Sequence, residues 1–415
     1  MDGLEKLAAV SNEVQFEQAD ERIPARPGPL FTPQPCGHSP AELKRRVRGE
    51  TRFIDVPGKS RPIPIYMSAA GGKVVPLLKA MLTTACERNC FYCPFRAGRG
   101  SRRVTFKPEE MARTFADIHR SGAVEGLFLS SGVFAGGPNT QNKLLDSAEY
   151  LRRELQFRGY LHLKLMPGCE RGQVQRAMQL ADRVSINLEA PNAERLARLA
   201  PKKIFYEELL TPLRWADEIR HELPAQLGWN GRWASTTTQF VVGAAGENDL
   251  EILSTAAHVI QRLGVRRTYF EAFNPVLDTP LENHPPQDPL RQFRLYEASY
   301  LLRDYGFDLE ELPFRSDGLL PLDRDPKRAA ADRAFTHQPV EINRADQEML
   351  LRIPGIGPRG VKKLLAARRQ RALRDLSQLR RLGVVAERAA PYITLAGKRP
   401  PRQLNYFGQD EGEWQ

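Results

Sequence analysis

Three of the five cysteines lie close together in the sequence, at Cys86, Cys90 and Cys93, while Cys36 and Cys169 stand alone. An odd number of cysteines argues against a disulfide framework and favours metal ligation. Zinc usually takes four protein ligands, often as two separated pairs, and the sequence has no second pair. Three thiolates suit a four-iron, four-sulfur cluster in which one iron keeps an open coordination position. The spacing therefore predicts a catalytic cluster, with Cys169 as a free thiol.

Short apolar runs alternate with segments of helical periodicity along the middle of the chain, and these elements must position the cysteines. Strands are expected at residues 77–84, 126–129, 161–165, 184–188, 237–242 and 268–273. Helices are expected at residues 108–120, 142–155, 173–180, 207–221 and 249–263. This alternation predicts an α/β fold of parallel βαβ units, in which chemistry collects at the carboxyl ends of the strands. The cysteine group directly follows the first strand.

The run CERNCFYCPF, with the aromatic Tyr92 directly before Cys93, resembles the CxxxCxΦC signature of radical S-adenosylmethionine (SAM) enzymes. The resemblance implies a [4Fe-4S] cluster on Cys86, Cys90 and Cys93, with SAM chelated to the open iron. One electron from the cluster then cleaves SAM and yields a 5′-deoxyadenosyl radical, which abstracts hydrogen from the substrate. The fold implied is a partial (β/α)6 radical-SAM barrel, and the electron donor is a protein such as flavodoxin or ferredoxin.

Polar residues and glycines follow the other strands, where SAM would lie. The candidate SAM-binding residues are Tyr92, Ser130, Ser131, Gly132, Lys164, Asn187, Glu189 and Gly243. The Ser130-Ser131-Gly132 run resembles the loop that holds the amino group of SAM in the superfamily. Asn187 and Glu189 are two positions apart in a strand, so both could face the ribose hydroxyls. Each residue type is also common in turns, and Glu189 could instead cap the following helix.

Positive charge is concentrated near the C-terminus. The whole chain carries a net charge of +11, and residues 341–402 alone contain fifteen Lys or Arg and five Asp or Glu. Such a basic segment predicts a polyanionic partner such as nucleic acid. Arginines also follow the cysteine group in PFRAGRGSRR, at Arg96, Arg99, Arg102 and Arg103. They either guide a phosphodiester backbone toward the site or belong to a solvated loop.

The run EINRADQEMLLRIPGIGPRGVKK resembles a helix-hairpin-helix motif, which binds the DNA backbone independently of sequence. Asn343 suits the N-cap of its first helix, with Asp346 as the reciprocal partner. Pro354-Gly355-Ile356-Gly357 breaks that helix, and Pro358 suits the start of the second. The implied DNA contacts are Gly355, Gly357, Arg359, Lys362 and Lys363. A weaker second copy is expected where Gly383 follows a leucine-rich run.

The combination of barrel and helix-hairpin-helix resembles a radical-SAM family assigned to DNA modification or repair, some members of which are linked to a uracil-DNA-glycosylase-like protein. The runs that carry the resemblance are GLFLSSGV, LHLKLMPG, DRVSINLEAP, TTQFVVGAAGE, RLYEASYLLRDYGF and EINRADQEMLLRIPGIG. It implies DNA and a glycosylase-like protein as partners. Two alternatives remain open: a radical SAM enzyme that modifies tRNA, and a non-catalytic DNA-binding protein whose structural cluster takes Cys169 or Cys36 as a fourth ligand.

Four regions are expected along the chain. Residues 1–74 form an N-terminal extension with a Pro-rich segment, residues 75–325 the barrel, residues 326–402 an all-α helix-hairpin-helix domain, and residues 403–415 an acidic tail. The N-terminus has neither a basic region nor an apolar run typical of a secretory signal. No apolar run approaches the roughly 18 residues of a membrane-spanning helix. A cytoplasmic location with no membrane partner is therefore expected.

Overall fold

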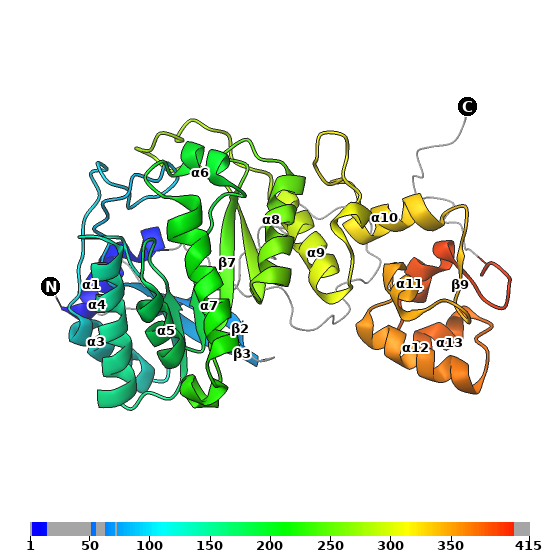
Figure 1. The fold of residues 1–415 in the computed structure, drawn as a ribbon, viewed down its shortest axis with the longest axis horizontal. Helices are drawn as coiled ribbons and strands as arrows, with labels where there is room; N and C mark the ends of the chain where they lie inside the picture. The colour runs from blue at the N-terminus through cyan, green and yellow to red at the C-terminus, as the bar shows by residue number, and fades with distance from the viewer. Residues whose placement is uncertain (1, 15–50, 55–62, 71–72, 402–415) are drawn as a thin grey trace. The chain divides into compact units, whose positions relative to one another are not determined.

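The computed structural model describes residues 2–14, 51–54, 63–70 and 73–401. The Pro-rich stretch around Cys36 and the predicted acidic tail lie outside these residues. The chain forms two compact units (Figure 1): the first unit is Met1–Tyr296 with Ser316–Leu319, and the second unit is Glu297–Arg315 with Leu320–Gln415. Among the described residues, no helix is long and apolar enough to cross a membrane.

One sheet of eight strands forms the centre of the first unit, and its strands lie side by side in sequence order. They are β1 (Thr51–Ile54), β2 (Ile63–Ala70), β3 (Lys73–Met81), β4 (Gly126–Ser130), β5 (Tyr160–Lys164), β6 (Arg183–Ser185), β7 (Ser235–Val242) and β8 (Arg267–Ala272). The pairs β1–β2 and β2–β3 are antiparallel, and β3 to β8 are parallel. The six predicted strands and the α/β fold with a partial (β/α)6 barrel are confirmed. The antiparallel β1 and β2 were not predicted.

Helices connect the parallel strands, and several of them lie together on one side of the sheet (Figure 1). The helices that correspond to predicted ones are α3 (Pro108–Arg120), α4 (Gly137–Glu149), α5 (Arg171–Leu180), α7 (Thr211–Glu222) and α8 (Asp249–Arg262). A π-helical turn, Tyr150–Glu154, extends α4, and another, Phe205–Leu210, precedes α7. Three further helices are α1 (Gly3–Val14), α6 (Ala193–Leu199) and α9 (Pro289–Asp304).

The inner face of the sheet is unusually polar for parallel strands, which are normally apolar on both faces. Side chains alternate along each strand, so the buried Leu127 and Leu129 of β4 share one face and Phe128 points to the other. In the register of the sheet, Phe128 lies between Lys79 of β3 and His162 of β5. This polar inner face is the one available to a functional site.

One buried arginine ties the edge of the helical layer to the sheet. The Arg152 guanidinium donates to the carbonyl oxygens of Leu180 (2.9 Å), Phe157 (2.9 Å) and Gly159 (2.8 Å). It also lies 3.2 Å from the Asp182 carboxylate. Its side chain is only 1% exposed. Arg152 therefore binds one acid and three backbone acceptors at once, and it is the buried cation of Asp182, whose other ion-pair partner, Arg232, is 72% exposed.

Replacing Arg152 with methionine is expected to lower the free energy of unfolding of the first unit by about 3–5 kcal/mol, because Asp182 would be left without its buried partner. Urea denaturation measures this change. The matched control is Arg153→Met in the same turn: the Arg153 side chain is 71% exposed, so a change within about 0.5 kcal/mol is expected. Equal unfolding midpoints for the two variants would contradict the structural role of Arg152.

The second unit is mostly helical. Its elements are α10 (Pro326–Phe335), α11 (Gln347–Arg352), α12 (Pro358–Gln370), α13 (Leu376–Arg381), α14 (Ala386–Ala389) and the parallel strand pair β9 (Val340–Glu341) and β10 (Ile393–Thr394). Short 3-10 turns lie at Leu309–Glu311 and Ala390–Tyr392. A core of fully buried residues joins these elements, among them Ile342, Leu350, Ile353, Leu364, Leu379 and Ile393.

The predicted N-cap of α11 was wrong. Asp346 caps this helix by accepting from the backbone N–H of Met349 at 2.7 Å. The Asn343 side chain instead donates to the carbonyl oxygen of Leu373 (2.9 Å) and accepts from its N–H (2.7 Å). Asn343 therefore ties the start of α11 to the segment before α13, a contact between residues thirty positions apart in the chain.

Candidate active site

The three clustered cysteines lie in a loop that follows β3 and line one cavity at the carboxyl ends of the parallel strands. The cavity has an empty volume of about 1120 Å³, which includes open solvent at its mouth. Cys86, Cys90 and Cys93 are all free of disulfides. Predicted SAM-binding residues also line this cavity: Tyr92, Ser130, Ser131, Gly132, Lys164, Asn187 and Glu189. The fold thus brings seven of the eight predicted SAM-binding residues to the same cavity as the cysteines.

Arg103 holds the cysteine loop in shape. Its guanidinium donates to the carbonyl oxygens of Thr84 (2.6 Å), Phe95 (2.8 Å), Arg96 (2.8 Å) and Arg99 (3.2 Å). A guanidinium that is engaged by four carbonyls of its own loop is not available to a phosphodiester. The hypothesis that Arg103 guides a nucleic-acid backbone was therefore wrong, and the residue has a structural role.

The loop after β4 packs directly against the cysteine loop. The backbone N–H of Glu87 donates to the carbonyl oxygen of Val133 at 2.8 Å. A Cβ atom at Gly132 would lie 2.4 Å from the carbonyl oxygen of Ala85. Only glycine permits this approach, so Gly132 is needed to place the Ser130-Ser131 segment beside the cysteines.

The three cysteines around one cavity suit the ligand set of an iron–sulfur cluster. Among the described residues, no three His, Cys, Asp or Glu side chains converge closely enough to hold one metal ion. The ligands of a four-iron cluster bind different irons, so their sulfur atoms surround the cluster and do not meet at one point. Burial raises the pKa of the Cys90 and Cys93 thiols. Bound iron would supply the positive charge that buried thiolates require.

Cys169 lies apart from these three residues. It is buried and free of a disulfide, and it does not line the cavity. Burial raises the pKa of its thiol to about 12. Its environment therefore favours the protonated thiol, and its assignment as a free thiol, not a fourth iron ligand, stays a prediction.

A chain of polar contacts links the SAM-binding candidates. Lys164 donates through Nζ to Asn187 Oδ1 at 2.7 Å, and Asn187 Nδ2 lies 3.5 Å from Glu189 Oε2. Glu189 also accepts from Lys203 Nζ at 2.8 Å and from the Tyr92 hydroxyl. Burial alone would raise the pKa of Glu189, but Lys203 and Lys164 outweigh burial and hold it below its usual value. Glu189 is thus an anchored carboxylate beside the cysteines.

The alternative role of Glu189 as a helix cap does not apply, because Asn192 caps α6 by accepting from the backbone N–H of Arg195 at 2.9 Å. Lys203 is a site residue that the sequence did not reveal. It lies between α6 and the π-helical turn before α7, away from any strand end. No pattern in the sequence marks it, since only the fold brings its ammonium group to Glu189.

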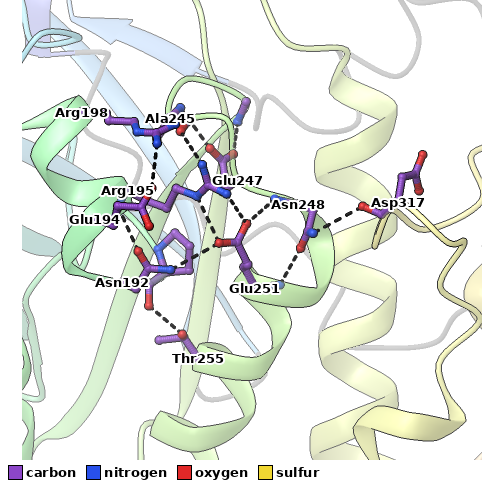
Figure 2. Close-up of polar contacts among 12 residues, drawn as sticks. Asn192, Glu194, Arg195, Arg198, Ala245, Glu247, Asn248, Glu251, Thr255 and Asp317 are labelled. Carbon is purple, nitrogen blue, oxygen red and sulfur yellow. Dashed lines mark hydrogen bonds and ion pairs between the residues drawn. The ribbon is translucent and has the colours of Figure 1, made fainter.

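Gly243 does not line the cavity, so its contact with SAM stays a prediction. The loop that begins at Gly243 is held by Glu247, whose carboxylate accepts from the backbone N–H groups of Gly243 and Ala245. Figure 2 shows the same loop beside Arg195, which pairs with Glu251 at 3.1 Å. Ala245 belongs to an apolar cluster that packs against Tyr92. The loop therefore forms a fixed apolar wall next to the aromatic residue of the cysteine motif.

A second acid, Glu271, lines the cavity. Glu271 of β8 is half-buried and accepts from Gln239 Nε2 of β7 at 2.7 Å. Removal of water by the surrounding protein raises the pKa of Glu271 to about 8, against the opposing effect of Lys79. The sequence held a signal for this residue that was not used, because Glu271 is an ionisable residue inside an otherwise apolar predicted strand.

The raised pKa of Glu271 predicts a specific dependence of stability on pH. The folded protein keeps this proton up to about pH 8, whereas the unfolded chain loses it near its ordinary pKa of roughly 4.3. The free energy of unfolding of the wild type should therefore fall as the pH rises between these two pKa values, by no more than about 1.4 kcal/mol per pH unit. Glu271→Gln has no such proton, so its stability relative to the wild type should rise between pH 5 and 8 and stay level above. Urea denaturation at several pH values tests this, and a constant difference would contradict it.

Three free thiols follow the first parallel strand of the partial barrel and lie beside polar strand ends. This arrangement is expected of an iron–sulfur enzyme of the radical type. Residues 81–259 match the family model described as the Radical SAM superfamily. The match covers less than half of the chain and supports an enzyme of the radical SAM type. Members of that superfamily use a [4Fe-4S] cluster and SAM and generally need an electron donor.

Several solved structures are similar to this chain. The FeFe-hydrogenase maturase HydG from Carboxydothermus hydrogenoformans is 18% identical with a TM-score of 0.44, over 55% of this chain and 51% of HydG. Methylornithine synthase (PylB) is 16% identical with a TM-score of 0.44, over 56% of this chain and 64% of PylB. The chain spans about half of the maturase and just under two thirds of the synthase. No curated protein sequence matches the chain.

Proposed function

We propose that this radical SAM enzyme modifies or repairs DNA. The observation that carries the proposal is the hairpin between α11 and α12 in the second unit, with lysines exposed on the helix that follows it. The domains proposed are the barrel at residues 75–325 and the helix-hairpin-helix domain at residues 326–402. A glycosylase-like protein is the further partner that the family resemblance suggests.

The geometry of the hairpin supports this proposal. Gly355 has a φ of 82°, and a Cβ atom there would lie 2.3 Å from the carbonyl oxygen of Val385. The N–H of Val385 donates to the carbonyl oxygen of Gly355 at 3.0 Å. The first hairpin therefore packs against residues 383–385, where the weaker second copy was expected, and Gly383 there also has a positive φ of 81°. Paired glycine hairpins leave backbone N–H groups with no side chain between them and a phosphate.

Charge on the same surface favours a phosphate backbone as the ligand. Arg359, Lys362 and Lys363 are exposed on α12. The Lys363 ammonium lies within 4.0 Å of the Cβ position of Gly383, so it stands beside the second hairpin as well. The N-terminus of a helix adds partial positive charge through its unpaired N–H groups. These groups contact phosphate and not bases, which supports binding without sequence preference.

The roles proposed for the site residues follow from their positions. When bound by Cys86, Cys90 and Cys93, the cluster would supply the electron that cleaves SAM. Ser130, Ser131 and Gly132 are proposed to bind the amino end of SAM, and the packing of their segment on the cysteine loop supports this role. Asn187 and Glu189 are proposed to bind the ribose hydroxyls, which is supported by their closeness, with 3.5 Å between Asn187 Nδ2 and Glu189 Oε2. A base in a duplex is shielded by its neighbours, so the target nucleotide would have to leave the stack to reach the cavity.

Release of 5′-deoxyadenosine tests the proposal. Anaerobically reconstituted and reduced protein receives SAM alone, SAM with duplex DNA, or SAM with tRNA of equal nucleotide content. The proposal expects duplex DNA to raise the rate and tRNA to compete poorly. If tRNA alone raises the rate, the enzyme acts on RNA, and the DNA proposal is overturned.

A further inference from the structure

Some polar groups of the inner face are assigned neither to the cluster nor to SAM. One of them, His162, does not line the cavity, and its Nε2 is engaged by Ser185 Oγ at 2.8 Å. Glu271 and Gln239 do line the cavity, on the neighbouring strands β8 and β7. They contact each other, at 2.7 Å between Gln239 Nε2 and Glu271 Oε2. This pair is therefore free to serve another ligand.

Both residues line the cavity and keep hydrogen-bonding capacity that the protein does not use. Within the described part of the chain, no protein group bonds Glu271 Oε1 or Gln239 Oε1. Three elements contribute charged groups that act on Glu271: β3 with Lys79, β5 with Lys164 and the segment after β6 with Glu189. Gln239 is buried and Glu271 is half-buried, and polar groups in such a place are costly when left unsatisfied unless a ligand completes their hydrogen bonds.

The chemistry of the pair indicates what such a ligand is like. A carboxyl group beside a carboxamide presents a donor and acceptors close together. The complementary partner is a planar group with an adjacent N–H and carbonyl or ring nitrogen, as on the edge of a nucleobase. Aromatic residues line the same cavity, at Tyr92, Phe95 and Phe273, and flipped bases are commonly held by such stacking surfaces together with hydrogen bonds to their edges.

We propose that Glu271 and Gln239 recognise the hydrogen-bonding edge of an extruded nucleobase and so fix which base meets the radical. The inference rests on the proposed action on DNA for the identity of the ligand. It assigns substrate recognition to side chains of β7 and β8. The proposed SAM contacts other than Gly243 lie at the ends of β4 and β5 or in the loops that follow β3, β4 and β6. Apart from Gly243, recognition and radical generation therefore use different strands of the same barrel.

The test measures substrate-stimulated release of 5′-deoxyadenosine by the full-length, cluster-loaded protein. The probes are a duplex of mixed sequence and the four free deoxynucleosides. Glu271→Leu and Gln239→Leu are each expected to lower the maximal stimulated rate at least about tenfold, because a missing hydrogen bond leaves a buried polar partner unpaired. The duplex concentration for half-maximal stimulation should change less than about twofold, since docking would depend on the second unit. Glu271→Gln, which keeps a donor and an acceptor, should recover most of the rate.

Glu149→Gln on α4 is the matched control, because Glu149 pairs with Arg176 outside the cavity. It should leave every rate unchanged. If the duplex stimulates the wild type and both leucine variants respond equally well, the inference fails while the DNA proposal stands. If the duplex has no effect but a nucleoside stimulates the wild type and not Glu271→Leu, the inference stands and the DNA proposal fails. If no probe stimulates the wild type, both are overturned.

Discussion

Cys93→Ala is expected to lose both the iron–sulfur cluster and the release of 5′-deoxyadenosine, with the rate falling by at least about three orders of magnitude. Cys93 lies in the cavity with Cys86 and Cys90, and a cluster with only two remaining protein ligands cannot be held. Iron content, the visible absorption of the reconstituted protein and chromatographic measurement of 5′-deoxyadenosine check this result. Cys86→Ala and Cys90→Ala should behave in the same way.

Cys169→Ala is the control that separates a cluster with an open iron from one with four protein ligands. Cys169 is 3% exposed and does not line the cavity, so its removal should leave iron content and SAM cleavage intact. The same result is expected for Cys36→Ala, although Cys36 lies outside the described residues. Loss of iron in either control would assign a fourth ligand to that cysteine and close the iron position that SAM requires.

The parallel part of the sheet could be predicted because buried parallel strands are short apolar runs between helical segments. The antiparallel pair β1 and β2 could not. Pro64 lies inside β2 and Pro76 inside β3, and a proline removes a backbone donor and normally argues against a strand. The pairing of these strands is visible only in the folded sheet, where Pro64 lies opposite Phe53.

In the candidate site too, residues marked by a local sequence pattern could be predicted, and residues brought in only by tertiary packing could not. Strand-end residues such as Asn187 were found because the carboxyl ends of parallel strands meet at one edge. Lys203 was missed because it follows no strand and is brought to Glu189 by the packing of the segment after α6. Arg103 was misinterpreted because a positive charge in a glycine-rich loop predicts exposure, whereas the folded loop uses it to satisfy four carbonyls. Charge alone does not distinguish a ligand-binding arginine from a structural one.

Replacing both Lys362 and Lys363 with glutamine is expected to weaken duplex DNA binding by about ten- to a hundredfold at moderate salt, because each exposed lysine would neutralise a phosphate and release a counterion. The slope of log K against log salt concentration should become shallower by roughly 1.8, about 0.9 for each phosphate that is no longer neutralised. Fluorescence anisotropy with a labelled duplex, repeated at several salt concentrations, measures both quantities. Affinity should be equal for two unrelated duplex sequences, since backbone contacts carry no base information.

The control must remove the same charge from the other unit. Arg120 and Arg153 have side chains 76% and 71% exposed in the first unit. Their double replacement with glutamine lowers the net charge equally but leaves the hairpins untouched. If this control weakens binding as much as the lysine pair does, DNA is attracted by the overall positive charge and the hairpin is not its docking site. If only the lysine pair matters, the second unit holds the duplex, and the barrel is left to select the base.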